Sequence, residues 1–205
     1  MEAFSGRGFP LSQHLIIGAK IFALYGLLYL SAQHFPIRTP IELPHSYLDD
    51  YISLNSSWVW IYMIAYPYVP ISFLMLKSKY LIQSYAKSYV ALTVSTFIIF
   101  VAFPTILPRE QYPVDSSFSG QALDFLRSTD APTNCLPSLH VATSFLSSWW
   151  LLLQNKYLGI IGFIFTVLVM WSTLALKQHI IWDVITGTIA AMIAVFVPIY
   201  FSRDI

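Results

Sequence analysis

The chain has 205 residues, of which 57% are hydrophobic and only 10% are charged, and its mean hydropathy is +0.64. Because soluble domains carry roughly 25% charged residues, this composition excludes an ordinary water-soluble protein and predicts one that lies in a membrane. The net charge of +1 excludes the strongly basic surface that nucleic-acid binding requires. Cys135 is the only cysteine, so no intrachain disulfide can form.

Six segments are apolar and long enough, or nearly so, to span a membrane, which takes about 20 mostly apolar residues. They cover about residues 13–32, 57–76, 88–107, 139–154, 157–176 and 180–201. The fourth is short and rich in hydroxyl groups, which favours a helix that faces its neighbours more than lipid. Only three residues separate the fifth and sixth segments, which predicts a tight antiparallel turn. We therefore expect an all-α integral membrane bundle of six transmembrane helices, formed by one domain of residues 1–205.

The distribution of lysine and arginine predicts the orientation of this bundle. An even number of spans places both termini on one side, where Arg7, Lys77, Lys79, Lys87, Lys156 and Arg203 lie, against Arg38, Arg109, Arg127 and Lys177 on the other. The positive-inside rule therefore predicts cytoplasmic termini. The long loops at about 33–56 and 108–138 then lie on the non-cytoplasmic face. Within the second loop, the segment from Ser119 to Arg127 has apolar residues at helical spacing, and it is either a short interfacial helix or ordinary loop packing.

Three of the predicted spans bring reactive side chains to one membrane depth on this face. Arg109 follows the third span, Ser138 and His140 begin the fourth, and His179 and Asp183 begin the sixth. Ionisable residues are costly in a membrane, so they are candidates for function. His179 and Asp183 are four residues apart and share a helix face, so the carboxylate can orient one imidazole nitrogen and leave the other free to attack. A capping or helix-surface pair is the alternative interpretation.

The other candidate residues are typical of an anion site. Pro137 and Ser138 predict a helix N-terminus whose free N–H groups bind anions, and Arg109 supplies a fork for phosphate oxygens. Together with His140 as a proton donor and acceptor, these elements predict a phosphate cradle beside a histidine nucleophile. Two histidines and one carboxylate could instead bind zinc or iron. Because Arg109 and Lys177 would oppose a cation, we expect no metal and no cofactor.

At these positions the sequence resembles the type 2 phosphatidic acid phosphatase superfamily of membrane lipid phosphatases and phosphotransferases. The middle motif of that superfamily, Pro-Ser-x-His, is present at residues 137–140. Its third motif is Ser-Arg, five residues, His, three residues, Asp, and it is matched from Ser172 to Asp183, with Thr173 in place of the arginine. The resemblance covers about residues 100–190, which would form the catalytic core.

The first motif of the superfamily is only partly present. It ends in Arg-Pro and has a lysine seven residues earlier, whereas this chain has Arg109 followed by Glu110, with Ala102 at the lysine position. Two phosphate-binding cations are thus absent, counting the one replaced by Thr173. Lys177, in the turn beside the third motif, either replaces one of them or is a lysine that snorkels to the interface.

The resemblance also implies a role for each of the candidate residues. His179 would attack phosphorus and become phosphohistidine, with Asp183 orienting its ring. His140 would protonate the leaving oxygen and then deprotonate the attacking water or alcohol. Arg109 and Ser138 would hold the phosphoryl oxygens.

The expected function is hydrolysis of a lipid phosphate or diphosphate at the periplasmic, extracellular or lumenal face, with membrane lipids as partners and without nucleic acid. The Pro-Ser-Leu-His form and the missing third-motif arginine are closest to the inositol phosphorylceramide synthase-like branch. Transfer of a phosphoryl headgroup onto a lipid alcohol is therefore the alternative reaction. A transporter or scaffold is the alternative from another class, but transporter sites tend to lie at the midplane between repeated halves, and this chain shows no repeat. The sequence predicts neither the lipid nor the oligomeric state.

Overall fold

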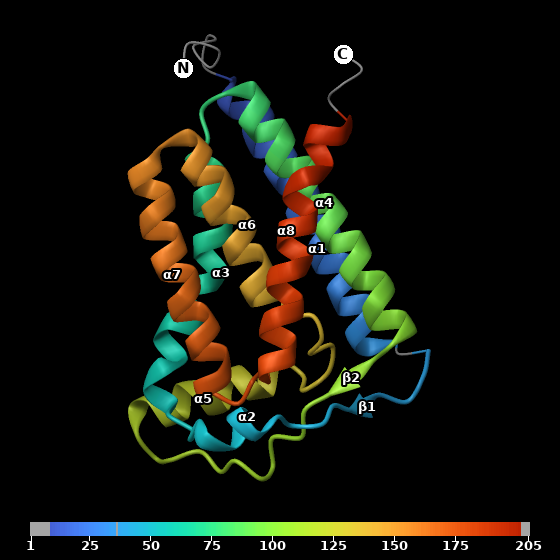
Figure 1. Ribbon diagram of the computed structural model, residues 1–205, viewed down its shortest axis with the longest axis vertical. Helices are drawn as coiled ribbons and strands as arrows, with labels where there is room; N and C mark the ends of the chain where they lie inside the picture. The colour runs from blue at the N-terminus through green and yellow to red at the C-terminus, as the bar shows by residue number, and fades with distance from the viewer. Residues whose placement is uncertain (1–8, 36, 202–205) are drawn as a thin grey trace.

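The structure of the protein is a computed structural model that describes residues 9–35 and 37–201, and α-helices dominate these residues (Figure 1). The long helices are α1 (Leu11–His34), α3 (Val59–Leu74), α4 (Lys79–Ala102), α6 (Leu139–Gln154), α7 (Lys156–Ala175) and α8 (Ile181–Phe201). Shorter elements are α2 (Tyr47–Tyr51), a 3-10 turn (Ser56–Trp58), α5 (Phe118–Thr129) and the parallel two-residue strands β1 (Ile41–Glu42) and β2 (Thr105–Ile106). The predicted all-α fold is confirmed.

The long helices run up and down side by side, while α2, α5 and the two strands gather at one end of the bundle (Figure 1). At the opposite end, the backbone N–H of Lys77 donates to Gln154 Oε1 at 3.1 Å. This bond joins the turn between α3 and α4 to the end of α6. Helix α6 therefore runs from the end that carries α2 and α5 to the end where α3 finishes.

Five helices of the described chain, rather than six, are long and apolar enough to cross a membrane. They are α1, α4, α7, α8 and the segment Ser56–Leu74 that includes α3. Helix α6 has 16 residues and is about 24 Å long, which is short for a span. As its hydroxyl content predicts, α6 faces other helices: Ser144, Ser147 and Ser148 are fully buried. Ser147 and Ser148 form hydrogen bonds with Tyr85 and Tyr68, respectively.

The predicted third span was placed too late in the sequence. Helix α4 begins at Lys79 because the Ser78 side chain caps it, accepting a hydrogen bond from the Leu81 N–H at 3.1 Å. Lys87 is exposed on the side of this helix, so it interrupts the apolar pattern without ending the helix. The helix ends at Ala102, two residues before Pro104, as expected near a proline.

Two glycines let α6 approach its neighbours closely enough to place the reactive residues. A Cβ atom at Gly159 of α7 would lie 2.2 Å from Leu152 Cα of α6. A Cβ atom at Gly187 of α8 would lie 2.5 Å from the Ser138 carbonyl oxygen, directly before α6. Real Cβ contacts are not this short, so larger side chains at these positions would push the helices apart. The close contact at Gly187 brings the starts of α6 and α8 together.

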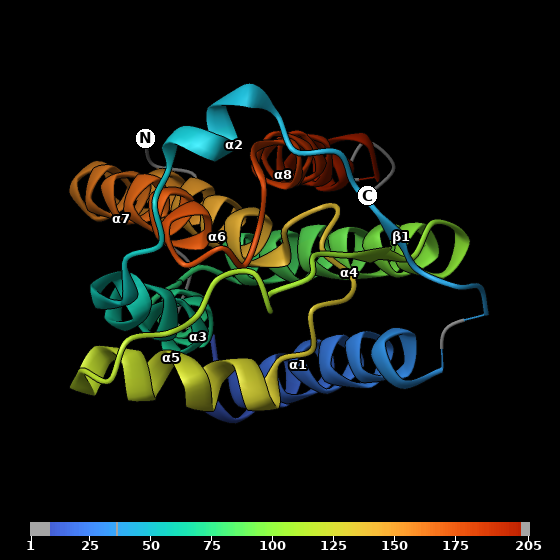
Figure 2. The ribbon, with the colours of Figure 1, turned by 90° about the horizontal axis from the view of Figure 1, so that it is seen from below.

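A short helix is present in the second long loop, as one of the two open interpretations predicts. Helix α5 is capped by Ser117, whose hydroxyl accepts from the Gly120 N–H at 3.0 Å. Its buried Leu123 and Leu126 belong to a cluster with residues of α3, while Phe125 is exposed on the outer side. Figure 2 views this end of the bundle and shows α5 lying across it beside α3 and α1.

Candidate active site

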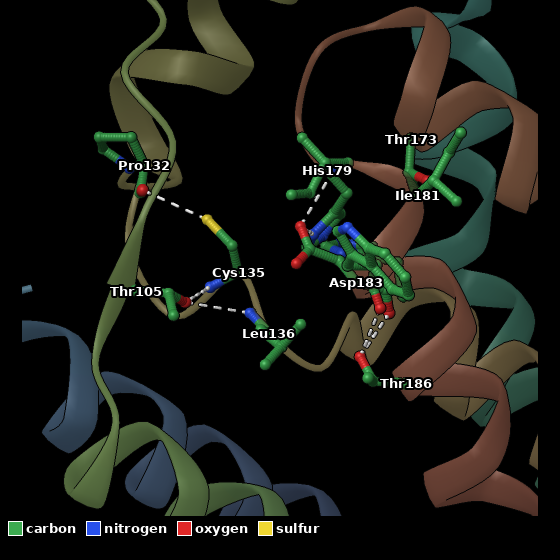
Figure 3. A network of polar contacts seen from close by, with 12 residues as sticks. Thr105, Pro132, Cys135, Leu136, Thr173, His179, Ile181, Asp183 and Thr186 are labelled. Atoms are coloured by element: carbon green, nitrogen blue, oxygen red, sulfur yellow. Dashed lines mark hydrogen bonds and ion pairs between the residues drawn. The ribbon is translucent and has the colours of Figure 1, made fainter. Parts of the chain in front are cut away.

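The turn between α7 and α8 places His179 and Asp183 on one buried face. The backbone N–H groups of Gln178 and His179 both donate to the Thr173 carbonyl, at 3.0 and 3.2 Å, which confirms the tight turn. The buried Asp183 Oδ2 accepts from the Ile180 N–H at 3.0 Å and lies 3.1 Å from His179 Nδ1 (Figure 3). The carboxylate is therefore held in place by the backbone. Asp183 thus contacts Nδ1 of His179 and leaves Nε2, the other ring nitrogen, available to a substrate.

His140, in the first turn of α6, faces His179. The centroids of the two rings are 6.1 Å apart, with 57° between the ring planes. On its other side, His140 Nδ1 lies 3.1 Å from the Tyr62 hydroxyl, and the two rings pack at a centroid distance of 4.2 Å. The Tyr62 hydroxyl donates to Asp130 Oδ2 at 3.3 Å, and Tyr29 donates to the other oxygen at 2.8 Å. His140 is thus connected to a carboxylate through a tyrosine.

Arg109 reaches the same place from the loop after β2. Its Nη1 donates to the Asp130 carbonyl at 2.6 Å, and its Nη2 donates to the Ala131 carbonyl at 3.4 Å. Arg109, His140 and His179 line one small polar cavity. The structure therefore brings together three of the residues that the sequence singled out, with Asp183 directly behind His179.

The two remaining candidates lie elsewhere. Ser138 is fully buried at the start of α6, and its backbone N–H donates to the Asp183 carbonyl at 3.0 Å. Its hydroxyl makes no hydrogen bond within the described residues, and Ser138 is not among the residues that line the cavity. Lys177 has a left-handed backbone (φ 53°), and its Nζ donates to the Asp49 carbonyl at 2.8 Å and lies over the Tyr112 ring. Lys177 therefore binds the segment that contains α2 and does not face the cavity.

Sequence reasoning missed several residues of the site. Tyr62 and Asp130 belong to none of the sequence motifs, and only the fold brings them close to His140. Gln178 and Asn134 also line the cavity, at 1% and 4% exposure, and the amide nitrogen of each is buried without a hydrogen-bond partner in the described part of the chain. The one available sequence signal was the position of Gln178 directly before His179.

The wall opposite α8 is a short loop before α6. Thr105 Oγ1 accepts from the N–H groups of Cys135 and Leu136 at 3.0 and 3.1 Å, and the Cys135 thiol donates to the Pro132 carbonyl at 3.3 Å (Figure 3). Burial raises the pKa of the Cys135 thiol, which disfavours the thiolate that a cysteine nucleophile needs. Cys135 therefore lines the cavity and is not a candidate nucleophile. Among residues 9–35 and 37–201, no group of three or more His, Cys, Asp or Glu is placed to hold a metal ion.

Comparison with known protein families matches residues 34–197, well over half of the chain, to the PAP2 superfamily. The chain belongs to the PAP2 superfamily. This confirms the resemblance seen in the histidine motifs, and membership of the PAP2 superfamily supports activity of the phosphatase or phosphotransferase type. The matched segment includes all of the cavity residues except Tyr29. No curated protein and no solved structure gives a significant match to the chain.

Proposed function

We propose that the protein breaks a phosphate ester or anhydride bond of a membrane lipid through a phosphohistidine on His179. The observation that carries this proposal is the pair of histidines facing one arginine-lined cavity, each ring held from behind by its own hydrogen-bonding group. Hydrolysis of a lipid phosphate or diphosphate is the leading reaction. Transfer of the phosphoryl headgroup to a lipid alcohol, as in the inositol phosphorylceramide synthase-like branch, is the alternative.

In the first step, His179 Nδ1–H donates to Asp183, so the lone pair of Nε2 attacks phosphorus. The new N–P bond forms as the bond between phosphorus and the leaving oxygen breaks. His140, protonated at this stage, gives its proton to that oxygen, so the leaving group departs as a neutral alcohol from an ester or as a protonated phosphate from an anhydride. Arg109 balances the negative charge that the equatorial phosphoryl oxygens carry in the transition state.

In the second step, the neutral His140 removes a proton from the incoming hydroxyl compound. Its oxygen attacks phosphorus, the N–P bond breaks, and His179 returns to its starting state. If the incoming compound is water, the product is a phosphate, and if it is a lipid alcohol, the product is a new phosphate ester. The chemistry of both reactions is the same until this step.

Tyr62 and Asp130 are positioning residues for His140. With the Tyr62 hydroxyl donating to Asp130, its oxygen can accept from His140 Nδ1–H. This arrangement fixes the tautomer of His140 and leaves Nε2 to exchange the proton with the substrate. The carboxylate stabilises the imidazolium through the tyrosine.

The proposed membrane placement puts this reaction at the non-cytoplasmic face. Helix α6 would be a sixth, shorter pass within the bundle, which places both ends of the chain on the cytoplasmic side. Lys77, Lys79, Lys87 and Lys156 support this orientation. Lys79 and Lys156 begin α4 and α7, Lys77 contacts the end of α6, and Lys87 lies in the first half of α4, away from the start of α6 that carries His140. Arg7 and Arg203, which also entered the charge comparison, lie outside the described residues.

The proposal is tested with purified protein in detergent, a radiolabelled lipid phosphate panel and a chelator. We expect turnover that survives the chelator and is lost in His179→Ala. Thin-layer separation of the products distinguishes the two reactions: free phosphate or a water-soluble headgroup phosphate indicates hydrolysis, whereas a new phosphodiester lipid indicates transfer. A protein that releases nothing from any lipid, with or without added alcohol, would instead be a scaffold or transporter.

A further inference from the structure

Gln178 and Asn134 present unpaired amide groups to the cavity between the two histidines. Gln178 Nε2 and Asn134 Nδ2 are buried, and neither has a hydrogen-bond partner among the residues that the structure describes. Arg109 Nε, in the wall of the same cavity, is also buried and unpaired. A buried donor without an acceptor is unfavourable, so three such donors around one cavity indicate a ligand with several acceptor oxygens.

The charge around this cavity is low for a phosphate site. Within the described chain, Arg109 is the one fixed cation that lines it, and Asp130 adds a carboxylate. Asp183 places a second carboxylate directly behind His179. Lys177, the neighbour of Gln178, is turned to the Asp49 carbonyl and contributes no donor here. Neutral amides therefore stand where further cations would be needed to compensate a second negative charge on the ligand.

We propose that Gln178 and Asn134 bind the equatorial oxygens of the phosphoryl group and that this neutral cradle selects a singly charged phosphoryl group. This inference rests on the proposed function and narrows its substrate to a phosphodiester lipid. Amide N–H groups form strong hydrogen bonds with a phosphoryl oxygen, yet they add no charge. In the first step, Arg109 and the protonated His140 supply two positive charges, which the carboxylates of Asp130 and Asp183 already balance. In a site of low dielectric constant, the second charge of a phosphomonoester therefore lacks a partner and disfavours binding. The unpaired Gln178 Oε1 remains for a hydroxyl hydrogen, which the acceptor water or alcohol brings.

The charge of the substrate gives a test that does not depend on how the enzyme itself titrates. A phosphomonoester loses its second proton near pH 6, whereas a phosphodiester keeps one negative charge throughout. The two substrates are phosphatidic acid and a phosphodiester lipid with the same acyl chains, either phosphatidylglycerol or phosphatidylinositol, and diacylglycerol is measured as the common product. We expect kcat/KM to favour the diester at pH 8. The ratio of monoester to diester kcat/KM should rise on the order of 100-fold from pH 8 to pH 5, as the monoester gains its proton.

Isosteric variants test the two amides. Gln178→Met removes the donor at similar size, and it should lower kcat/KM for the diester about 10- to 100-fold. Gln178→Glu and Asn134→Asp replace the donor with a negative charge and should lower kcat/KM further than Gln178→Met. Asn134→Gly also removes the donor, and it suits the left-handed backbone at this position (φ 58°). Gln111→Glu is the matched control, since Gln111 is exposed in the loop of residues 108–138 that also contains Asn134 and lies outside the cavity. Its kcat/KM should stay within about twofold of the wild-type value.

The results separate failure of the cradle from failure of the proposed function. A monoester preference at pH 8, or Gln178→Glu and Asn134→Asp variants as active as Gln111→Glu, overturns the cradle while His179-dependent turnover keeps the proposed function. If neither lipid is turned over in a His179-dependent way, the proposed function fails. The cradle is then tested by ³¹P NMR line broadening of dimethyl phosphate and inorganic phosphate at pH 8. Preferential broadening of dimethyl phosphate that is lost in Gln178→Glu supports the cradle, and equal broadening in both proteins refutes it.

Discussion

Replacing Tyr62 with phenylalanine isolates the role of the hydroxyl between His140 and Asp130. The phenyl ring keeps the packing against His140 at 4.2 Å between centroids, and only the contacts at 3.1 and 3.3 Å are lost. A hydrogen bond to a charged group contributes about 1.5–3 kcal/mol. If that bond stabilises protonated His140 in the transition state, kcat falls about 10- to 150-fold while KM changes little.

The assay compares two leaving groups on this variant. An alkoxide needs a proton from His140 to leave, whereas p-nitrophenolate leaves without one. Tyr62→Phe should therefore slow the first step strongly with the lipid and little with a p-nitrophenyl ester of the same headgroup. Both rates are measured as the single-turnover burst of the released leaving group, because the second step needs His140 with either substrate. Tyr68→Phe is the matched control. Tyr68 lies on α3 like Tyr62, and this change removes a partly buried hydroxyl contact with Ser148, away from the cavity. Equal losses with both leaving groups would refute the positioning role and indicate a structural defect.

Three further predictions concern the frame of the site. Asp183→Asn should lower kcat by about 10³-fold or more, because the amide cannot hold His179 in the required tautomer. The rate of single-turnover phosphoryl transfer measures this loss. A loss below tenfold would contradict the role of Asp183 in orienting His179. Lys177→Ala should lower the melting temperature and change KM less than about threefold, since its ammonium binds the Asp49 carbonyl; a tenfold rise in KM would instead return Lys177 to phosphate binding. Gly187→Leu should prevent the close approach to Ser138 and reduce the yield of folded protein, measured by detergent size exclusion, and a normal yield with full activity would contradict the packing.

The parts of the fold that follow from local pattern could be predicted. Long apolar runs locate five of the membrane helices. The four-residue spacing of His179 and Asp183 predicts their contact, but His179 lies in the turn two residues before α8 and not on a shared helix face. The start of α4 could not be read from hydropathy, because Lys87 lies on an exposed side of a helix that continues past it. Helix α6 is hard to recognise from hydropathy because it is packed among other helices, where the hydroxyl groups of Ser147 and Ser148 find partners.

The parts of the site that depend on contacts between distant segments could not be predicted. Tyr62 and His140 are 78 residues apart, and nothing in either segment indicates the other. Lys177 was assigned to phosphate because it is close to His179 in sequence, yet the left-handed turn directs its side chain to Asp49, 128 residues away. Closeness in sequence to a reactive residue does not tell in which direction a side chain points. In this turn Gln178 rather than Lys177 lines the cavity.

Trapping the covalent intermediate tests the mechanism most directly. The enzyme is mixed with a p-nitrophenyl ester of the substrate headgroup, quenched in alkali within one turnover, digested and analysed by mass spectrometry. We expect the phosphoryl group on the peptide that contains His179, in larger amount in His140→Ala and absent in His179→Ala. Turnover without any such adduct, or an adduct on a different side chain that persists in His179→Ala, would contradict nucleophilic attack by His179.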